Sequence, residues 1–188
     1  MAAKLNVVSV RLVEEQPMVS DTPIRTPIDA VRLLGSDMCT LDREVICVIN
    51  LRSDGVPVCC NYISVGAVNE CMAHPREILK SAILCNATSM LLIHNHPSGN
   101  LHPSKEDTMI TDRMLKLGEI IGIPLVDHII VGGSNEAYFS FREKRELEYE
   151  HVKLETNYEN LSFPTSLVAE ADEIGKEEVS VPKRRKGR

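Results

Sequence analysis

The 188-residue sequence contains no tryptophan, and aromatic residues make up only 4% of it. Proteins that bind single-stranded nucleic acid stack the bases on aromatic side chains, so this scarcity argues against such binding as the main activity. An excess of positive charge is also missing, because the formal net charge is −6 at pH 7. A general binder of nucleic acid or of anionic membranes carries the opposite sign, although a local basic patch is compatible with this value.

Long apolar segments and paired cysteines are absent as well. No apolar run approaches the roughly 20 residues that a membrane-spanning helix needs, and charges interrupt residues 1–16, so we expect neither a signal peptide nor a membrane partner. The cysteines include no C-x-x-C pair, and three of them lie in apolar runs. We therefore expect reduced, mostly core thiols in a cytoplasmic protein. The six are Cys39, Cys47, Cys59, Cys60, Cys71 and Cys85.

The composition that remains is that of a soluble globular protein, with 43% hydrophobic and 26% charged residues. Its patterning predicts an N-terminal strand (residues 5–13) and linker over residues 1–26, one domain over residues 27–150, and a mostly disordered tail over residues 151–188. The tail is acidic first and ends in "PKRRKGR". This basic end is either a solvated terminus or a weak contact for nucleic acid or a partner.

Periodicity and turn residues predict the elements of the domain. One helix begins at Thr26-Pro27, with Asp29 closing a capping box, and stops near Gly35. The turn "RSDG" joins two β-rich runs, residues 44–51 and 56–66, into a hairpin. A second helix opens at Pro75 and has an apolar face of Ile78, Leu79, Ala82 and Ile83.

The rest of the domain continues this mixed pattern. The apolar run at residues 89–94 predicts a buried strand, and a helix then starts near Ser104 and ends at Gly122. Its helical spacing is carried by Ile110, Met114, Leu117 and Ile121. A buried strand over residues 125–131, a turn "GGSN" and a strand over residues 137–141 follow. This order predicts an α/β (α+β) fold with a mixed sheet and flanking helices.

The stretch "HNHPSGNLHPSKED", residues 94–107, carries candidate metal ligands. Residues i and i+2 of a strand share one face, so His94 and His96 can aim at one point at the strand end. Asp107 follows in the first turn of the next helix. Two imidazoles and one carboxylate leave a fourth tetrahedral position for water, which is typical of a catalytic rather than a structural zinc site.

Each part of this stretch also has a simpler interpretation. Ser104-x-x-Asp107 before an apolar helix is a capping box, and two histidines at i and i+2 are often plain surface residues. The combination favours a site, because polar groups at the end of a buried strand are costly without partners. The two interpretations are compatible, since Ser104 can cap the helix while Asp107 binds metal.

The same residues resemble the JAMM metal motif: His-x-His, seven residues, Ser, two residues, Asp. Together with "HPREILKSAILCNATSM" and "LVDHIIVG", they make residues 27–146 similar to the RadC-like branch of the JAB/MPN superfamily. The resemblance implies an MPN-type fold and a zinc metallohydrolase with His94, His96 and Asp107 as Zn²⁺ ligands. Characterised enzymes of the superfamily are metallopeptidases that cleave peptide or isopeptide bonds, so we expect a protein or peptide substrate.

Two other functions stay open beside this one. The RadC-like branch is labelled with DNA repair, but this sequence lacks the helix-hairpin-helix region usual in longer members. Its absence favours a stand-alone JAB module of the kind met in mobile elements or phage. A metal-binding scaffold without catalysis is the third alternative, and the intact His, His, Ser and Asp argue against it.

The resemblance further implies a general base and an oxyanion-stabilising serine. The family uses a Glu on an upstream strand as the base, and Glu44 is the best match, with Glu77 and Glu70 as rivals. Glu77 lies in the first turn of a predicted helix, where the dipole favours an acid in any case. Ser104 matches the family serine that helps to bind the oxyanion.

The remaining histidines have weaker indications. His102 lies in the loop, where it is expected to be exposed and able to touch substrate, and His74 precedes Pro75 as a helix-entry residue. Asp127-His128 lies in a predicted buried strand. It is either a structural hydrogen-bonded pair or a support for the zinc ligands.

Overall fold

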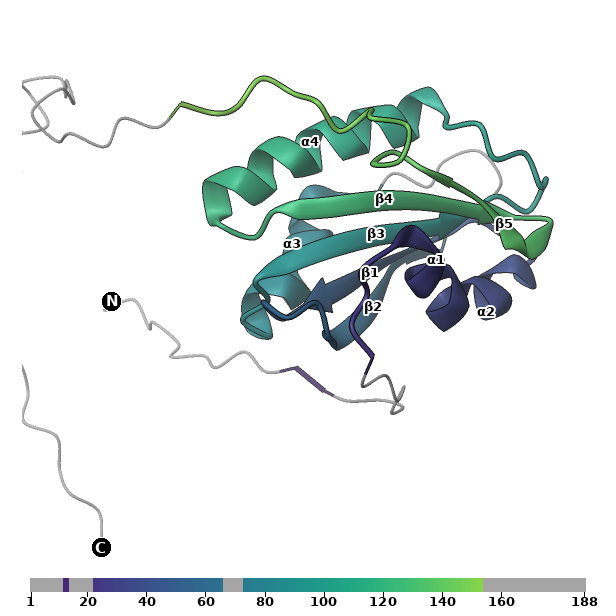
Figure 1. The fold of residues 1–188 in the computed structure, drawn as a ribbon, viewed down its shortest axis with the longest axis horizontal. Coiled ribbons are helices and arrows are strands. Elements are labelled where there is room, and N and C mark those ends of the chain that lie inside the picture. The colour runs from purple at the N-terminus through teal and green to yellow at the C-terminus, as the bar shows by residue number, and fades with distance from the viewer. Residues whose placement is uncertain (1–11, 14–21, 66–72, 154–188) are drawn as a thin grey trace, which may run out of the picture. The chain divides into compact units, whose positions relative to one another are not determined.

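The computed structural model describes residues 12–13, 22–65 and 73–153 (Figure 1). Residues 5–11 of the strand predicted over residues 5–13, Glu70, Cys71 and the tail beyond residue 153 lie outside the described residues. Leu12 and Val13, the described end of that predicted strand, are not in a strand. The elements, in chain order, are α1 (Pro27–Ala30), the π-helical turn η1 (Val31–Gly35), α2 (Ser36–Cys39), β1 (Val45–Leu51), β2 (Pro57–Val65), α3 (Pro75–Leu84), β3 (Ser89–Asn95), α4 (Lys105–Ile121), β4 (Leu125–Gly132) and β5 (Ser134–Ser140).

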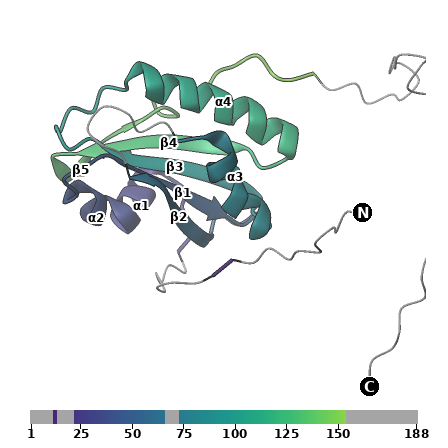
Figure 2. The same ribbon diagram turned by 180° about the vertical axis from the view of Figure 1, so that it is seen from behind.

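The strands form one mixed sheet in the order β2-β1-β3-β4-β5. β1 runs antiparallel to both β2 and β3, β4 runs antiparallel to β5, and only β3 and β4 are parallel. A parallel pair needs a long crossover, and α4 supplies it. Helices α1 and α2 cover one face of the sheet, and α3 and α4 cover the other, as the opposite views in Figures 1 and 2 show. The predicted α+β fold with a mixed sheet is confirmed.

The central strands are apolar throughout because helices cover both of their faces. In β1, Ile46 and Val48 pack with the α3/α4 side, whereas Cys47 and Ile49 pack with the α1/α2 side. All seven residues of β1 are buried. Each large aliphatic side chain buried in this way stabilises the fold by about 1.5–3 kcal/mol. None of the described helices is long and apolar enough to cross a membrane.

The first helical segment does not stop at Gly35, as the sequence predicted. It passes through the π-helical turn η1 and continues through α2 to Cys39. Gly35 keeps helical dihedral angles, φ −59° and ψ −41°. A glycine inside a helix costs about 1 kcal/mol relative to alanine. Leu34 and Met38, both fully buried on either side of Gly35, more than offset that cost.

Two predicted apolar faces are narrower than expected. Ile83 is 51% exposed and Ile121 is 41% exposed, although Ala82 and Met114 on the same helices are fully buried. Ile83 lies about 100° further round α3 than Ala82, which turns it away from the sheet. The predicted end of α4 is confirmed, because Gly122 adopts the left-handed conformation at φ 80°. The last turn is shorter than "GGSN", since β5 begins at Ser134 directly after Gly133, whose φ is +71°.

Candidate metal centre

Four side chains meet where β1 begins, β3 ends and α4 begins. They are Glu44, His94, His96 and Asp107, whose potential ligand atoms all lie within 4.8 Å of one another. The distance is 3.1 Å from His94 Nε2 to Asp107 Oδ1, and 3.4 Å from His96 Nε2 to Asp107 Oδ2. Glu44 Oε1 lies 3.5 Å from His96 Nε2 and 3.9 Å from His94 Nε2. The structure therefore brings together the three predicted ligands and the predicted base.

Strand pairing explains why Glu44 is here although it lies far away in sequence. β1 and β3 are antiparallel with Ile46 opposite His94, and two more residues in this register place Glu44 opposite His96. The buried Asn95 holds the backbone on both sides of Glu44. Its Oδ1 accepts a hydrogen bond from Val45 N at 2.8 Å, and its Nδ2 donates one to Arg43 O at 3.0 Å. Asn95 thus fixes where β1 starts.

Backbone contacts orient His96 and the loop that follows it. His96 N donates to Val131 O at 2.8 Å, and the ring Nδ1 lies 2.5 Å from the carbonyl oxygen of Asn100. A carbonyl only accepts, so Nδ1 carries the hydrogen, and in the neutral ring Nε2 keeps its lone pair. Gly132 allows this approach, because a Cβ there would lie 2.9 Å from His96 O and 3.2 Å from Gly99 Cα.

Ser104 and Asp107 form the predicted capping box of α4. Asp107 Oδ2 accepts hydrogen bonds from Ser104 N and Ser104 Oγ, both at 2.7 Å, and Asp107 N donates to Ser104 Oγ at 3.0 Å. Burial by itself would raise the pKa of the Asp107 carboxyl. The adjacent His94 and His96 rings and the hydrogen bonds from Ser104 outweigh burial and hold that pKa well below its usual range. Asp107 is therefore a carboxylate at neutral pH.

Burial differs across the cluster. The side chains of His94 and Asp107 are 0% and 5% exposed, whereas those of His96 and Glu44 are 13% and 25% exposed. Substrate or solvent can therefore reach the cluster from the side of Glu44 and His96. The pKa of His96 is raised, mainly because the Asp107 carboxylate lies beside its ring and stabilises the protonated form, and burial opposes this only in part.

The chain matches the family model of the RadC-like JAB domain over residues 24–147. It belongs to the RadC-like JAB domain family. A UPF0758 protein of Thermotoga maritima is 45% identical over 111 residues, which cover 59% of this chain and 49% of that protein. A UPF0758 protein of Desulforamulus reducens is 42% identical over 122 residues, covering 65% of this chain and 54% of the relative. The chain spans about half the length of these curated relatives, and their names state no activity or ligand.

The donor set of this RadC-like JAB domain is chemically suited to a transition metal. Imidazole nitrogen together with carboxylate oxygen is a combination that zinc accepts readily. The backbone partner of His96 leaves its Nε2 directed at the cluster, and Asp107 Oδ1, unlike Oδ2, receives no hydrogen bond from Ser104. Residues His94, His96 and Asp107 could therefore hold a metal ion, with Glu44 beside it.

The other candidates of the RadC-like JAB domain lie elsewhere. Glu77 forms an exposed ion pair with Lys80 at 2.5 Å and is not part of the cluster. His74 caps α3 by accepting a hydrogen bond from Arg76 N, as expected of a helix-entry residue. His102 is exposed, as predicted. Of the described cysteines, only Cys47 is fully buried, and all five are free thiols.

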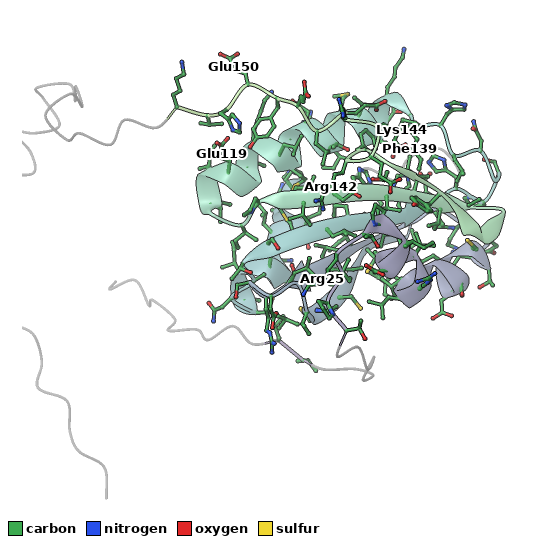
Figure 3. All side chains as sticks on the ribbon, viewed as in Figure 1. Arg25, Glu119, Phe139, Arg142, Lys144 and Glu150 are labelled. Carbon is green, nitrogen blue, oxygen red and sulfur yellow. The ribbon has the colours of Figure 1, made fainter. Side chains whose placement is uncertain are left out.

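The pair Asp127-His128 divides between two roles. Asp127 accepts hydrogen bonds from His128 N, Arg142 N and Ser140 Oγ at 2.7–3.0 Å, so it fixes the start of the segment after β5, where Arg142 is labelled in Figure 3. Burial raises its pKa despite these three donors. His128 instead points its ring at His94, a contact that the sequence left open. The sequence analysis did not identify Asn95, Thr111 or Gly132 as residues that support the site. Only Asn95 had a signal in the sequence, since it is a polar amide residue at the end of the apolar run that forms β3.

Proposed function

We propose that this chain is a zinc-dependent hydrolase of the JAMM type that cleaves peptide or isopeptide bonds. The observation that supports it is the position of Glu44, 3.5 Å from His96 at the accessible side of a His94–His96–Asp107 cluster. His94, His96 and Asp107 can hold a metal ion, and the carboxylate of Glu44 lies beside them without holding any of the three in place. Metal-assisted hydrolysis needs both kinds of group: ligands that hold the ion and a separate base that takes a proton from the water.

Each residue has a distinct task in this proposal. His94, His96 and Asp107 hold the ion, which would supply Lewis acidity to water and to the scissile carbonyl. Glu44 takes the proton of the attacking water and returns it to the leaving amine. Ser104 stabilises the oxyanion. Its single hydroxyl hydrogen is directed at Asp107 Oδ2 here, so the hydroxyl must turn toward the substrate to play that part.

The proposed substrate is a protein or peptide, and the proposed compartment is the cytoplasm. Five free cysteines among the described residues fit a reducing environment. The net charge of −6 gives no general attraction to nucleic acid, so the DNA-associated alternative depends on the basic end "PKRRKGR" alone. We propose at most a weak nucleic-acid contact there.

Zinc analysis and the substitution Glu44→Gln together test the proposal. The purified wild-type protein should hold about one zinc, and His96→Ala should lose most of it. Glu44→Gln should keep the zinc and the fold, because the amide preserves the shape. Its hydrolysis of peptide or isopeptide substrates should fall by about 10²–10⁴-fold, the usual contribution of general-base catalysis. Glu77→Gln, which alters an exposed ion pair remote from the cluster, is the matched control.

Three results would contradict parts of the proposal. Equal, negligible zinc in wild type and His96→Ala after reconstitution with zinc would remove the metal site. Full activity of Glu44→Gln would remove Glu44 as the base. Cleavage of nucleic acid, with peptide and isopeptide substrates left intact, would favour the DNA-associated alternative.

A further inference from the structure

A continuous chain of buried polar atoms leads from His94 back to the helix that carries Asp107. His94 Nδ1 lies 2.8 Å from His128 Nε2, and His128 Nδ1 lies 2.6 Å from Thr111 Oγ1. Thr111 Oγ1 in turn donates to the backbone oxygen of Asp107 at 2.6 Å. His94 and His128 are fully buried and Thr111 is 2% exposed, so water does not compete for these hydrogen bonds.

The chemistry of these groups determines the direction of every hydrogen bond. The carbonyl of Asp107 can only accept, so the hydroxyl hydrogen of Thr111 must point to it. Thr111 Oγ1 has no second hydrogen and therefore accepts from His128 Nδ1–H. A neutral His128 then presents a bare Nε2, which accepts from His94 Nδ1–H. Full burial without a carboxylate partner favours this neutral form of His128.

We propose that Thr111 and His128 are positioning residues that hold His94 in the tautomer with an unprotonated Nε2 directed at the metal centre. This inference rests on the proposed zinc site and adds two residues that touch neither metal nor substrate. Partners of this kind fix the tautomer and orientation of metal-binding histidines. Phe141, stacked on the His128 ring at 5.2 Å between centroids and 7° between planes, holds that ring in place.

The two histidine ligands are supported in different ways. His96 gives its Nδ1–H to a backbone oxygen, that of Asn100, which no side-chain substitution removes. His94 depends on an imidazole, which can change its own tautomer unless Thr111 fixes it. The orientation of His94 is therefore sensitive to one hydroxyl group about two hydrogen bonds away, whereas that of His96 is not.

Thr111→Val tests this dependence, because valine keeps the shape of threonine and removes the hydroxyl. Zinc affinity, measured by competition with a chelator, should fall by about 10–100-fold, the usual effect of losing such a partner. Thr111→Ser keeps the hydroxyl and should restore affinity. Thr108→Val is the matched control, since Thr108 Oγ1 donates to the Ser104 carbonyl at 3.0 Å on the exposed side of the same helix. It should leave zinc affinity unchanged.

A second measurement reports on the tautomer without metal or activity. Nitrogen-15 NMR of the zinc-free protein should show neutral His128 protonated at Nδ1 alone in wild type and in Thr111→Ser, and a mixture of His128 tautomers in Thr111→Val. His128→Gln removes the imidazole ring but keeps an oxygen that can accept a hydrogen bond from His94, whereas His128→Phe offers no acceptor. The zinc affinity of His128→Gln should therefore be higher than that of His128→Phe. A role in stability alone would move neither readout.

Unchanged zinc affinity in Thr111→Val and His128→Phe, together with an unchanged His128 tautomer in Thr111→Val, would overturn the inference while the proposed function stands. A wild-type protein that binds no zinc would instead defeat the proposed function. The tautomer measurement would still decide whether Thr111 fixes the tautomer of His128.

Discussion

Two helix starts in this molecule are built from the same four-residue pattern. Thr26-x-x-Asp29 begins α1 and Ser104-x-x-Asp107 begins α4. In both, one carboxylate oxygen accepts hydrogen bonds from the backbone nitrogen and the hydroxyl of the capping residue. The distances are 2.9 and 2.7 Å at Thr26, and 2.7 and 2.7 Å at Ser104. Local chemistry alone does not distinguish the two sites.

The surroundings of the two carboxylates, Asp29 and Asp107, distinguish the two sites. Asp29 takes its remaining hydrogen bond from the exposed backbone of Arg25, and its pKa is lowered mainly by the Thr26 side chain. Asp107 is only 4% exposed, and its second oxygen faces His94 at 3.1 Å. The comparison shows that a capping box becomes part of a candidate metal centre only where the fold brings other ligands to its free carboxylate oxygen.

The largest expected difference follows from replacing the two carboxylates. Asp107→Asn should lose most of the bound zinc and the hydrolytic activity together, because a neutral amide is a much poorer ligand than a carboxylate. Asp29→Asn should leave zinc unchanged and lower the free energy of unfolding by about 0.3–1 kcal/mol through the helix dipole. Zinc content and denaturant unfolding of both variants check this. Equal zinc retention in the two would make Asp107 a cap and nothing more.

A smaller difference is expected from the capping hydroxyls. Thr26→Ala and Ser104→Ala should each lower the free energy of unfolding by about 1 kcal/mol. Only Ser104→Ala should also weaken zinc binding, by about 10–100-fold, since Ser104 orients Asp107. Because we propose an oxyanion role for Ser104, hydrolysis at saturating zinc should fall by a further ~10²–10³-fold. If Ser104→Ala turned over substrate at the wild-type rate at saturating zinc, Ser104 would be a helix cap without an oxyanion role.

The smallest effect is expected at a third carboxylate, Asp127, which is as buried as Asp107 but has no contact with the ligands. Asp127→Asn should keep the zinc affinity of the wild type, which would show that contact with the histidines, and not burial alone, makes a carboxylate a zinc ligand. Burial raises the folded-state pKa of Asp127 above the ordinary value of 3.8, so the charged carboxylate destabilises the fold above that folded-state pKa, and this penalty is absent below 3.8. The stability of Asp127→Asn relative to wild type should therefore improve as pH rises, by no more than about 1.4 kcal/mol per pH unit. Denaturant unfolding across this pH range measures it, and a flat difference would contradict the raised pKa.

Local signals in the sequence were sufficient for most of the fold. The hairpin of β1 and β2, the helix opened by Pro75, the buried strand β3 and the end of α4 at Gly122 all follow from periodicity and turn residues that act within a few positions. The wrong predictions concern features that depend on tertiary packing. The first helical segment continues past Gly35 into α2, where Met38 is buried, and Ile83 is exposed.

The three candidate ligands were also evident in the sequence, because His94 and His96 share a strand face and Asp107 follows one loop later. What only the tertiary structure decided is which distant groups join them. Glu44 reaches the cluster through the antiparallel register of β1 with β3, Asn95 fixes that register, and His128 reaches His94 from the next strand of the sheet. Strand pairing and burial act between residues tens of positions apart, and no periodicity within one segment records which segments will be neighbours.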